Sequence, residues 1–168
     1  MTDTNDTPIP QGSLALLDTP LAQELLASDT YARVAYTSKD GTPRIVPTWF
    51  QWVAGELVMP TYLWAPHVTR PARRLSALRA HPDVAVSIDT EDRPPKVLLF
   101  RGKVEISEVA GTDPDYAISA HQYLGDDGAQ QLLTMADHPD TRMARITLRP
   151  TWVGLIDFES RVPGVMGG

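Results

Sequence analysis

The chain has 168 residues, of which 42% are hydrophobic and 21% charged, a composition typical of one globular domain. Its formal net charge of −6 argues against general binding to nucleic acid or to an anionic membrane, because both need a broad positive surface. The sequence has no cysteine, which excludes disulfides, thiolate metal ligands and a cysteine nucleophile.

The N-terminal segment, residues 1–12, is polar and contains two prolines and a glycine. This composition predicts a flexible tail ahead of a single domain over residues 13–168. The segment lacks the positive region and apolar run of a signal peptide, and no later apolar run approaches the roughly 20 residues of a membrane helix. We therefore expect a cytoplasmic protein with no membrane partner.

The first half of the domain is predicted to contain one short helix followed by three strands. Thr19 is a typical helix N-cap and Pro20 suits the first helical position. We expect strands at residues 31–36, 44–52 and 56–61, joined as a β-meander by turns at Asp40-Gly41 and Ala54-Gly55. Pro47 cannot donate to a sheet ladder, which places the second strand at an edge or makes it locally irregular.

The second half is predicted to alternate strands with helices. Leu75 and Leu78 give a basic helix over residues 70–80 its apolar stripe, and Gly102 indicates a bulge or bend in a long strand. The expected elements are strands 83–89, 96–107, 144–148 and 152–158, with helices 114–123 and 128–135. Together the segments predict a mainly β fold, a six- to seven-stranded antiparallel barrel, closed or nearly closed, with peripheral helices.

A group of arginines interrupts the acidic character of the chain. No Asp or Glu occurs between Glu56 and Asp83, and this interval contains Arg70, Arg73, Arg74 and Arg79. Arginine forks onto phosphate oxygens, and the start of a helix adds N–H donors and the positive end of a dipole. The pattern favours a site for a phosphorylated small molecule, while a solvated basic helix face is the simpler alternative.

Other catalytic constellations are missing from the sequence. The four histidines, His67, His81, His121 and His138, are scattered and form no pair with metal-ligand spacing, so we expect no metal site. Serine, histidine and aspartate occur without the sequence context of a nucleophile elbow. We therefore predict no catalytic side chain.

Four stretches in a fixed order carry a resemblance to a known superfamily. They are DGTPRIVPTWFQWVAGELVMPT, RRLSALRAHPDVAVSID, RPPKVLLFRGKVEI, and YLGDDG taken with RITLRPTWVGLIDFESRVP. This ordered set resembles the pyridoxamine 5'-phosphate oxidase-like superfamily, the flavin and deazaflavin split β-barrels. The resemblance covers roughly residues 20–163.

The resemblance implies a homodimer that holds a cofactor in each of two grooves between its barrels. The cofactor ring would face Arg44, Ile45, Val46, Pro47 and Thr48, where backbone amides meet its polar edge. The phosphate would be held by Thr61, Arg73 and Arg74, with Arg70 as a further candidate. Arg74 stands where most relatives have Lys, which keeps the charge but gives it forked geometry. Arg101 is expected in a structural or interface ion pair. The tryptophans are expected to fill the core or the dimer interface, with Trp49 or Trp64 on the substrate side of the ring as the alternative.

The implied activity is redox chemistry on a small organic substrate, with hydride transfer by the cofactor. FMN is favoured because one phosphate clamp suffices for it. The alternative is the deazaflavin coenzyme F420, whose acidic glutamyl tail prefers a longer basic groove. A non-catalytic flavin or haem binder is the competing class. A true pyridoxamine phosphate oxidase ranks lower, because the sequence has no second phosphate clamp for its substrate.

Overall fold

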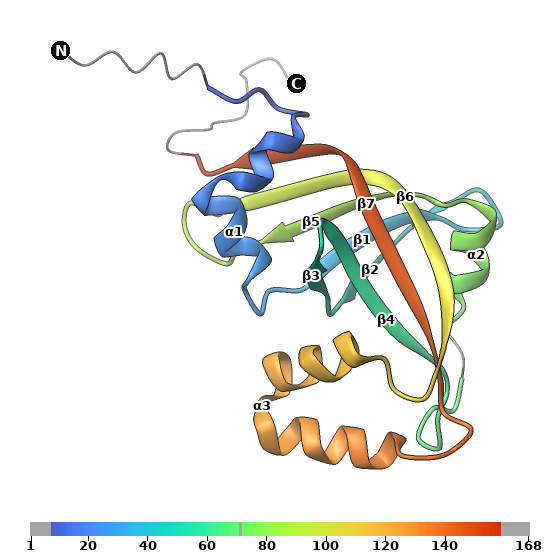
Figure 1. Ribbon diagram of the computed structural model, residues 1–168. Helices are drawn as coiled ribbons and strands as arrows, with labels where there is room; N and C mark the ends of the chain where they lie inside the picture. The colour runs from blue at the N-terminus through green and yellow to red at the C-terminus, as the bar shows by residue number, and fades with distance from the viewer. Residues whose placement is uncertain (1–7, 71, 159–168) are drawn as a thin grey trace.

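The computed structural model describes residues 8–70 and 72–158, which form a mainly β fold (Figure 1). Its seven described strands make one antiparallel sheet that curls around a core, with helices at its periphery, as predicted. In chain order the elements are η1 (Leu14–Asp18), α1 (Pro20–Leu26), β1 (Ala32–Thr37), β2 (Pro43–Thr48), β3 (Gln51–Val53), β4 (Glu56–Trp64), α2 (Arg74–Ala80), β5 (Asp83–Asp89), β6 (Val97–Ala110), α3 (Pro114–Ala136) and β7 (Arg142–Ile156).

The N-terminal elements attach to the last strand of the sheet. Thr19 caps α1 by accepting a hydrogen bond from the Ala22 N–H, as expected, and the 3-10 helix η1 precedes it. The Leu155 N–H donates to the Gln11 side chain at 2.8 Å, and the Gly12 N–H donates to the Val153 carbonyl at 2.7 Å. Residues 1–7 of the expected tail lie outside the described residues, so the tail and the domain boundary stay predictions.

The order of strands in the sheet is β2-β1-β5-β6-β7-β4-β3. The two predicted hairpins are confirmed, because β1 pairs with β2 and β3 pairs with β4. The three-stranded meander is wrong, because β2 and β3 lie at opposite ends of this order. The expected strand 44–52 divides at Trp49 and Phe50, and Phe50 turns into the core with 1% of its surface exposed. These two residues carry the chain from one edge of the sheet to the other.

β6 and β7 form the longest pair in the sheet, with a bulge near its middle. Arg101 faces Trp152 and Gly102 faces Pro150, which leaves Thr151 as the extra residue on β7. The strands predicted at 144–148 and 152–158 are thus one strand with a bulge where a break was expected. A Cβ on Gly102 would lie 2.7 Å from the Arg149 carbonyl oxygen, so this position requires glycine.

The core lies inside the curled sheet and receives side chains from α1 and α2. Alternate residues of the strands point inward, among them Phe100 of β6 and Leu148 of β7, both almost fully buried. Leu75 and Leu78 of α2 join the same core, as their helical spacing predicted. In the described chain, no helix is both long enough and apolar enough to span a membrane.

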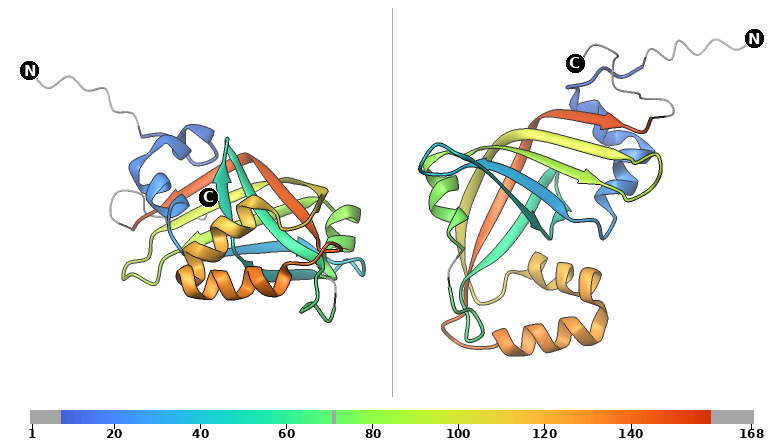
Figure 2. Two further views of the ribbon diagram at one scale, coloured as in Figure 1. Left: turned by 60° about the horizontal axis from the view of Figure 1, so that its bottom comes forward. Right: turned by 180° about the vertical axis from the view of Figure 1, so that it is seen from behind.

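α3 stands apart from the barrel as two arms (Figure 2). The arms meet at Gly125, whose φ of 70° and ψ of 174° interrupt the helix where the sequence predicted its end. The first arm is tied to β7 by a group that we call the α3 anchor, Asp113, Asp115 and Arg145. Arg145 Nη1 lies 3.0 Å from each Asp113 oxygen, and Nη2 lies 2.5 Å from Asp115 Oδ2.

Candidate functional site

The predicted ring-side strand, β2, is an edge strand that continues from a tight hairpin. The Gly41 N–H donates to the Ser38 carbonyl, and Gly41 has a φ of 80°, so the predicted Asp-Gly turn is confirmed. β2 ends the strand order next to β1, which agrees with Pro47 as a marker of an edge. The Ile45 side chain is 67% exposed on this edge, whereas Val46 packs against the core.

Arg44 is held by the hairpin that precedes it. Its Nη2 lies 3.3 Å from Asp40 Oδ2, and its Nη1 donates to the Thr42 hydroxyl and the Pro43 carbonyl. Hydrogen bonds from Thr42 and the nearby charge of Arg44 lower the pKa of Asp40. The Cα partner of Arg44 on β1 is Tyr36. Arg44 is therefore a fixed cation at the hairpin end of β2.

Arg74, the first residue of α2, has a different environment. Its side chain is partly buried, and burial lowers the pKa of its guanidinium, an effect that Tyr36 opposes. Arg44 and Arg74 therefore both neighbour Tyr36. Among the described residues, Arg70, Arg73 and Arg74 make no ion pair, whereas most other cations pair with carboxylates, namely Arg33, Arg44, Arg79, Lys96, Lys103, Arg145 and Arg149.

The other predicted phosphate ligands come from β4 and from the residues that precede α2. α2 begins at Arg74, four residues later than the expected helix, so Arg70 lies in the preceding loop and Arg73 is the N-cap residue, both exposed. Thr61 is partly buried on β4 opposite Ala144. No hydrogen bond of its side chain joins it to the arginines in the part of the chain that the structure describes. The structure thus brings Arg44 and Arg74 near one tyrosine.

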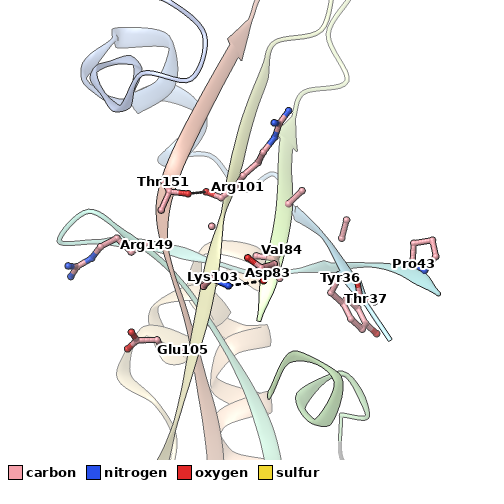
Figure 3. Close-up of a pocket in the computed structure, with 13 residues that line it drawn as sticks. Tyr36, Thr37, Pro43, Asp83, Val84, Arg101, Lys103, Glu105, Arg149 and Thr151 are labelled. Carbon is pink, nitrogen blue, oxygen red and sulfur yellow. Dashed lines mark hydrogen bonds and ion pairs between the residues drawn. The ribbon is translucent and has the colours of Figure 1, made fainter. Parts of the chain in front are cut away.

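A groove that the sequence did not predict lies on the outer face of the sheet (Figure 3). Its volume is about 710 Å³, and its lining includes Ala35, Ala85, Arg101, Lys103, Arg149 and Thr151. None of the nine predicted site residues lines it. The signal that could have revealed it is the small side chain at outward positions of two neighbouring strands, Ala35 of β1 and Ala85 of β5.

Arg101 is the cation at the centre of this outer face. Its guanidinium carbon lies 4.0 Å from the centroid of the Trp152 ring, a cation–π contact. The expected ion pair of Arg101 is not found among the described residues. The strand pairing explains this contact, because Arg101 and Trp152 face each other directly across β6 and β7.

Aromatic side chains join the end of β2 to α3. The Trp49 ring stacks on Tyr123 at 5.4 Å, with 12° between the planes, and lies 5.5 Å from Tyr116. Trp64 instead contacts His138 and is 42% exposed. Of the two tryptophans considered for the substrate side, Trp49 therefore follows the ring-side strand directly. Among the described residues, no group of three His, Asp or Glu could hold a metal ion.

Comparisons with known proteins place this geometry in a structural class. No family model and no curated protein matches the sequence. Among solved structures, an F420 reductase is 28% identical, with 79% of this chain and 94% of the reductase covered and a TM-score of 0.60. General stress protein 26 from Bacillus anthracis is 12% identical, with 86% and 95% covered and a TM-score of 0.57.

A further similar structure comes from Clostridium acetobutylicum. It is related to general stress protein 26 in the pyridoxinephosphate oxidase family and is 17% identical, with 86% of this chain and 89% of that chain covered and a TM-score of 0.53. The seven-stranded antiparallel sheet and these neighbours agree with the sequence resemblance. The chain has the split β-barrel fold of the pyridoxamine 5'-phosphate oxidase-like superfamily.

Proposed function

We propose that this protein is an oxidoreductase that binds a phosphate-bearing, flavin-type ring beside β2 and acts on a small organic substrate. The proposal rests on the fold and on one observation above others. Arg74 is partly buried beside Tyr36 and makes no ion pair in the described chain. A cation withdrawn from water without a carboxylate is unfavourable unless an anion completes its surroundings.

The arginines near α2 supply the phosphate end of the proposed site. Arg74 would hold the phosphate through its forked guanidinium, with Arg73 and Arg70 adding exposed charge and Thr61 a hydroxyl. The stretch Arg44–Thr48 would lie along the ring. When bound, the ring would supply the hydride chemistry, and the chain would supply position and charge. We assign no catalytic side chain.

FMN is the first candidate for the ring. Most cations away from α2 already pair with carboxylates, so few remain for the acidic tail of the deazaflavin. A single phosphate matches the small group of unpaired arginines. Coenzyme F420 is the second candidate, and the specific observation in its favour is the 28% identity to an F420 reductase.

We also propose that two copies of the chain form the working unit. A cross-strand row of residues runs over the outer face of the sheet, formed by Ile45, Ala35, Ala85, Arg101 and Trp152 in that order. It sets an exposed isoleucine beside two alanines, which suits a self-complementary contact. Light scattering should give twice the mass of one chain. An Ala85→Arg variant should give monomers, and a wild-type monomer would contradict the proposed dimer.

A comparison of two arginines on α2 tests the phosphate site. Arg74→Gln removes the partly buried cation, and Arg79→Gln removes an exposed one that pairs with Glu108 at 3.4 Å. Titration with FMN and with F420 should show that Arg74→Gln weakens binding about 10- to 100-fold, the range of a hydrogen bond to a charged group. Arg79→Gln should change it less than about twofold. Unchanged affinity in Arg74→Gln would remove the proposed phosphate site.

A turnover assay separates an enzyme from a binder. The reduced cofactor on the protein should reoxidise faster with some small organic acceptor than the free reduced cofactor does. If no acceptor in a broad panel accelerates it, the chain is a non-catalytic binder. Tighter binding of F420 than of FMN would reverse the order of the two rings.

A further inference from the structure

Four of the five tyrosines belong to one continuous array of aromatic rings between the barrel and α3. Trp49 is its centre, with its ring centroid 5.4 Å from that of Tyr123 and 5.5 Å from that of Tyr116. From Tyr123 the array continues to Tyr31 at 5.4 Å, and from Tyr116 it continues to Tyr62 at 4.9 Å. These are the distances of aromatic rings in direct contact, so the array has two branches that meet at Trp49.

Hydrophobic packing alone does not account for the tyrosines of this array. Burial raises the pKa of the phenols of Tyr62, Tyr116 and Tyr123, so three hydroxyl groups are partly withdrawn from water. This withdrawal is unfavourable unless new hydrogen bonds replace those to water, and phenylalanine would fill nearly the same space without a hydroxyl. The chain does use phenylalanine in its core, at Phe50 and Phe100. Tyrosine and tryptophan share a property that phenylalanine lacks, a ring that readily gives up one electron.

The two branches differ in where a proton can go. A tyrosine that loses an electron becomes strongly acidic, and its radical is stable only after the phenol proton has left. Tyr31 is 48% exposed, so water can accept the proton there, whereas Tyr62 is 8% exposed. Tyr123 donates its hydroxyl proton to the Thr30 carbonyl at 3.0 Å, and an amide carbonyl is too weak a base to keep it. Oxidation of the array should therefore settle on Tyr31.

We propose that Trp49, Tyr123 and Tyr31 form a relay that carries an oxidising equivalent from the end of β2 to the surface. An oxygen-centred radical takes one electron from the Trp49 ring and is itself reduced by one electron. Trp49 regains an electron from Tyr123, and Tyr123 regains one from Tyr31. Tyr31 then releases its phenol proton to water and becomes a neutral radical. A soluble thiol or ascorbate reduces this radical by donating one hydrogen atom.

The direction of the relay follows from the chemistry of its two ends. At neutral pH a tyrosyl radical, formed with loss of the proton, is a weaker oxidant than a tryptophan radical, so the electron moves toward Trp49. Trp49 is partly exposed and directly follows β2, beside which we place the redox site. The relay goes beyond the proposed function, because it needs only an oxidant that reaches Trp49. It would remove strong oxidants from that site before other side chains are damaged.

Pulse radiolysis of the full chain, without added cofactor, tests the relay. The azide radical oxidises tryptophan faster than tyrosine at neutral pH, and the tryptophan and tyrosyl radicals absorb at different wavelengths. In wild type, the tyrosyl absorbance should grow as the tryptophan-radical absorbance decays, in a first-order step whose rate is independent of protein concentration. Absence of this step in wild type would overturn the inference. Circular dichroism checks the folding of each variant.

Two tryptophan variants test where the relay begins. Trp49→Phe should lose the first-order step, because it removes the ring that contacts Tyr123. Trp64→Phe is the matched control and should keep the step, since among the described residues Trp64 has a ring contact with His138 and none with a tyrosine. Persistence of the step in Trp49→Phe, or its loss in Trp64→Phe, would overturn the inference.

Two tyrosine variants test where the relay ends. In Tyr31→Phe, any tyrosyl radical remains on an enclosed ring and should lose the rapid reduction by ascorbate that wild type shows. Tyr62→Phe removes the hydroxyl at the end of the other branch and should behave as wild type. Unchanged reduction in Tyr31→Phe would overturn the inference, and so would a loss confined to Tyr62→Phe. If Trp49→Phe does not fold, the exposed Tyr31→Phe change decides, because it removes only a hydroxyl near solvent.

Failure of the relay can be told from failure of the proposed function. A wild-type protein that binds neither FMN nor F420 would contradict the proposed function and leave the radiolysis result unaffected. Conversely, cofactor binding that depends on Arg74, together with no transfer from Trp49 to a tyrosine, would overturn the relay alone.

Discussion

Two partly buried arginines, Arg145 of the α3 anchor and Arg74 at the start of α2, differ in whether the described chain supplies a carboxylate to them. In the α3 anchor, Arg145 is 27% exposed and meets two carboxylates, of which Asp113 is almost fully buried. Burial by itself would lower the pKa of Arg145, but bonds and charge from Asp113 and Asp115 outweigh it and raise the pKa. Arg74 is also partly buried, makes no ion pair with the described carboxylates, and has its pKa lowered by burial.

The presence or absence of a carboxylate partner indicates whether a partly buried arginine stabilises the fold or could bind an anion. An arginine with carboxylates inside the same chain holds two elements together, here α3 and β7, and has no capacity left for a ligand. An arginine that is partly buried without a carboxylate partner does not stabilise the cofactor-free protein, and its charge remains available to a bound anion. Burial is similar in kind at the two sites. The two sites differ in whether the chain supplies a negative charge beside the arginine, and substitution of each arginine tests the effect of this difference on stability.

The largest effect should come from removing the anchor cation. Arg145→Met leaves Asp113 as a buried carboxylate without its counter-ion, and the free energy of unfolding should fall by about 3–5 kcal/mol. Urea denaturation measures this change. The control is Arg142→Met, three residues earlier on β7, where the side chain is exposed and the loss should be under about 0.5 kcal/mol. Similar losses in the two variants would show that the anchor does not hold the fold.

The stability of the protein at alkaline pH provides a second test of the region around the α3 anchor. Tyr116 lies just after the anchor, and burial, with the nearby Tyr62, raises the pKa of its phenol. A raised pKa of this kind stabilises the fold below the unfolded value of about 10, and the contribution is lost as the pH rises above it. The midpoint of thermal unfolding should therefore fall as the pH rises above about 10.

Tyr116→Phe isolates this contribution from the packing of the ring. It removes the ionising group and keeps the ring contacts with Trp49 and Tyr62. The midpoint of the variant should decline less steeply with pH than that of wild type. Parallel declines would mean that the alkaline loss originates at other groups.

Removing the cation of Arg74 should not lower the free energy of unfolding, in contrast to the loss expected at Arg145. Arg74→Met keeps the apolar stem and removes an unpaired charge, so the cofactor-free protein should be unchanged or more stable by up to about 1 kcal/mol. The same denaturation experiment applies. A loss comparable to that of Arg145→Met would indicate that Arg74 is structural, and would break the distinction between the two sites.

The smallest effect is expected at an exposed pair. Arg79 lies on α2 and its Nη2 is 3.4 Å from Glu108, with both side chains about half exposed. Arg79→Ala should therefore change the free energy of unfolding by less than about 0.5 kcal/mol. A larger loss would mean that exposed charges on α2 contribute to the fold, and the contrast would then rest on exposure as well as pairing.

Local features of the fold were predictable because local chemistry decides them. The Thr19 cap, the Asp40-Gly41 hairpin and the Gly125 interruption each depend on a few adjacent residues. Strand pairing was not predictable in this way. β1 pairs with β5 and β4 with β7, partners far apart in sequence whose apolar alternation looks alike. The Thr151 bulge was taken for a strand break because proline follows Arg149.

In the candidate site, too, residue identities were predictable from the sequence, whereas contacts that depend on tertiary structure were not. The acid-free interval identified Arg74, because a charge pattern is visible in the sequence. The lack of a carboxylate beside Arg74 depends on tertiary structure, as does the ion pair between Arg44 and Asp40. The α3 anchor was missed, although its Asp-Pro-Asp stretch is a recognisable helix start.

The central place of β7 has a consequence for how the protein is made. β7 is the last described strand, and it pairs with both β6 and β4, so the sheet cannot be completed until it is synthesised. β4 ends at Trp64 and β7 begins at Arg142. At typical translation rates, the nascent chain waits on the order of 4–16 s with β4 lacking this neighbour. We expect chaperone contacts during synthesis to concentrate on that interval.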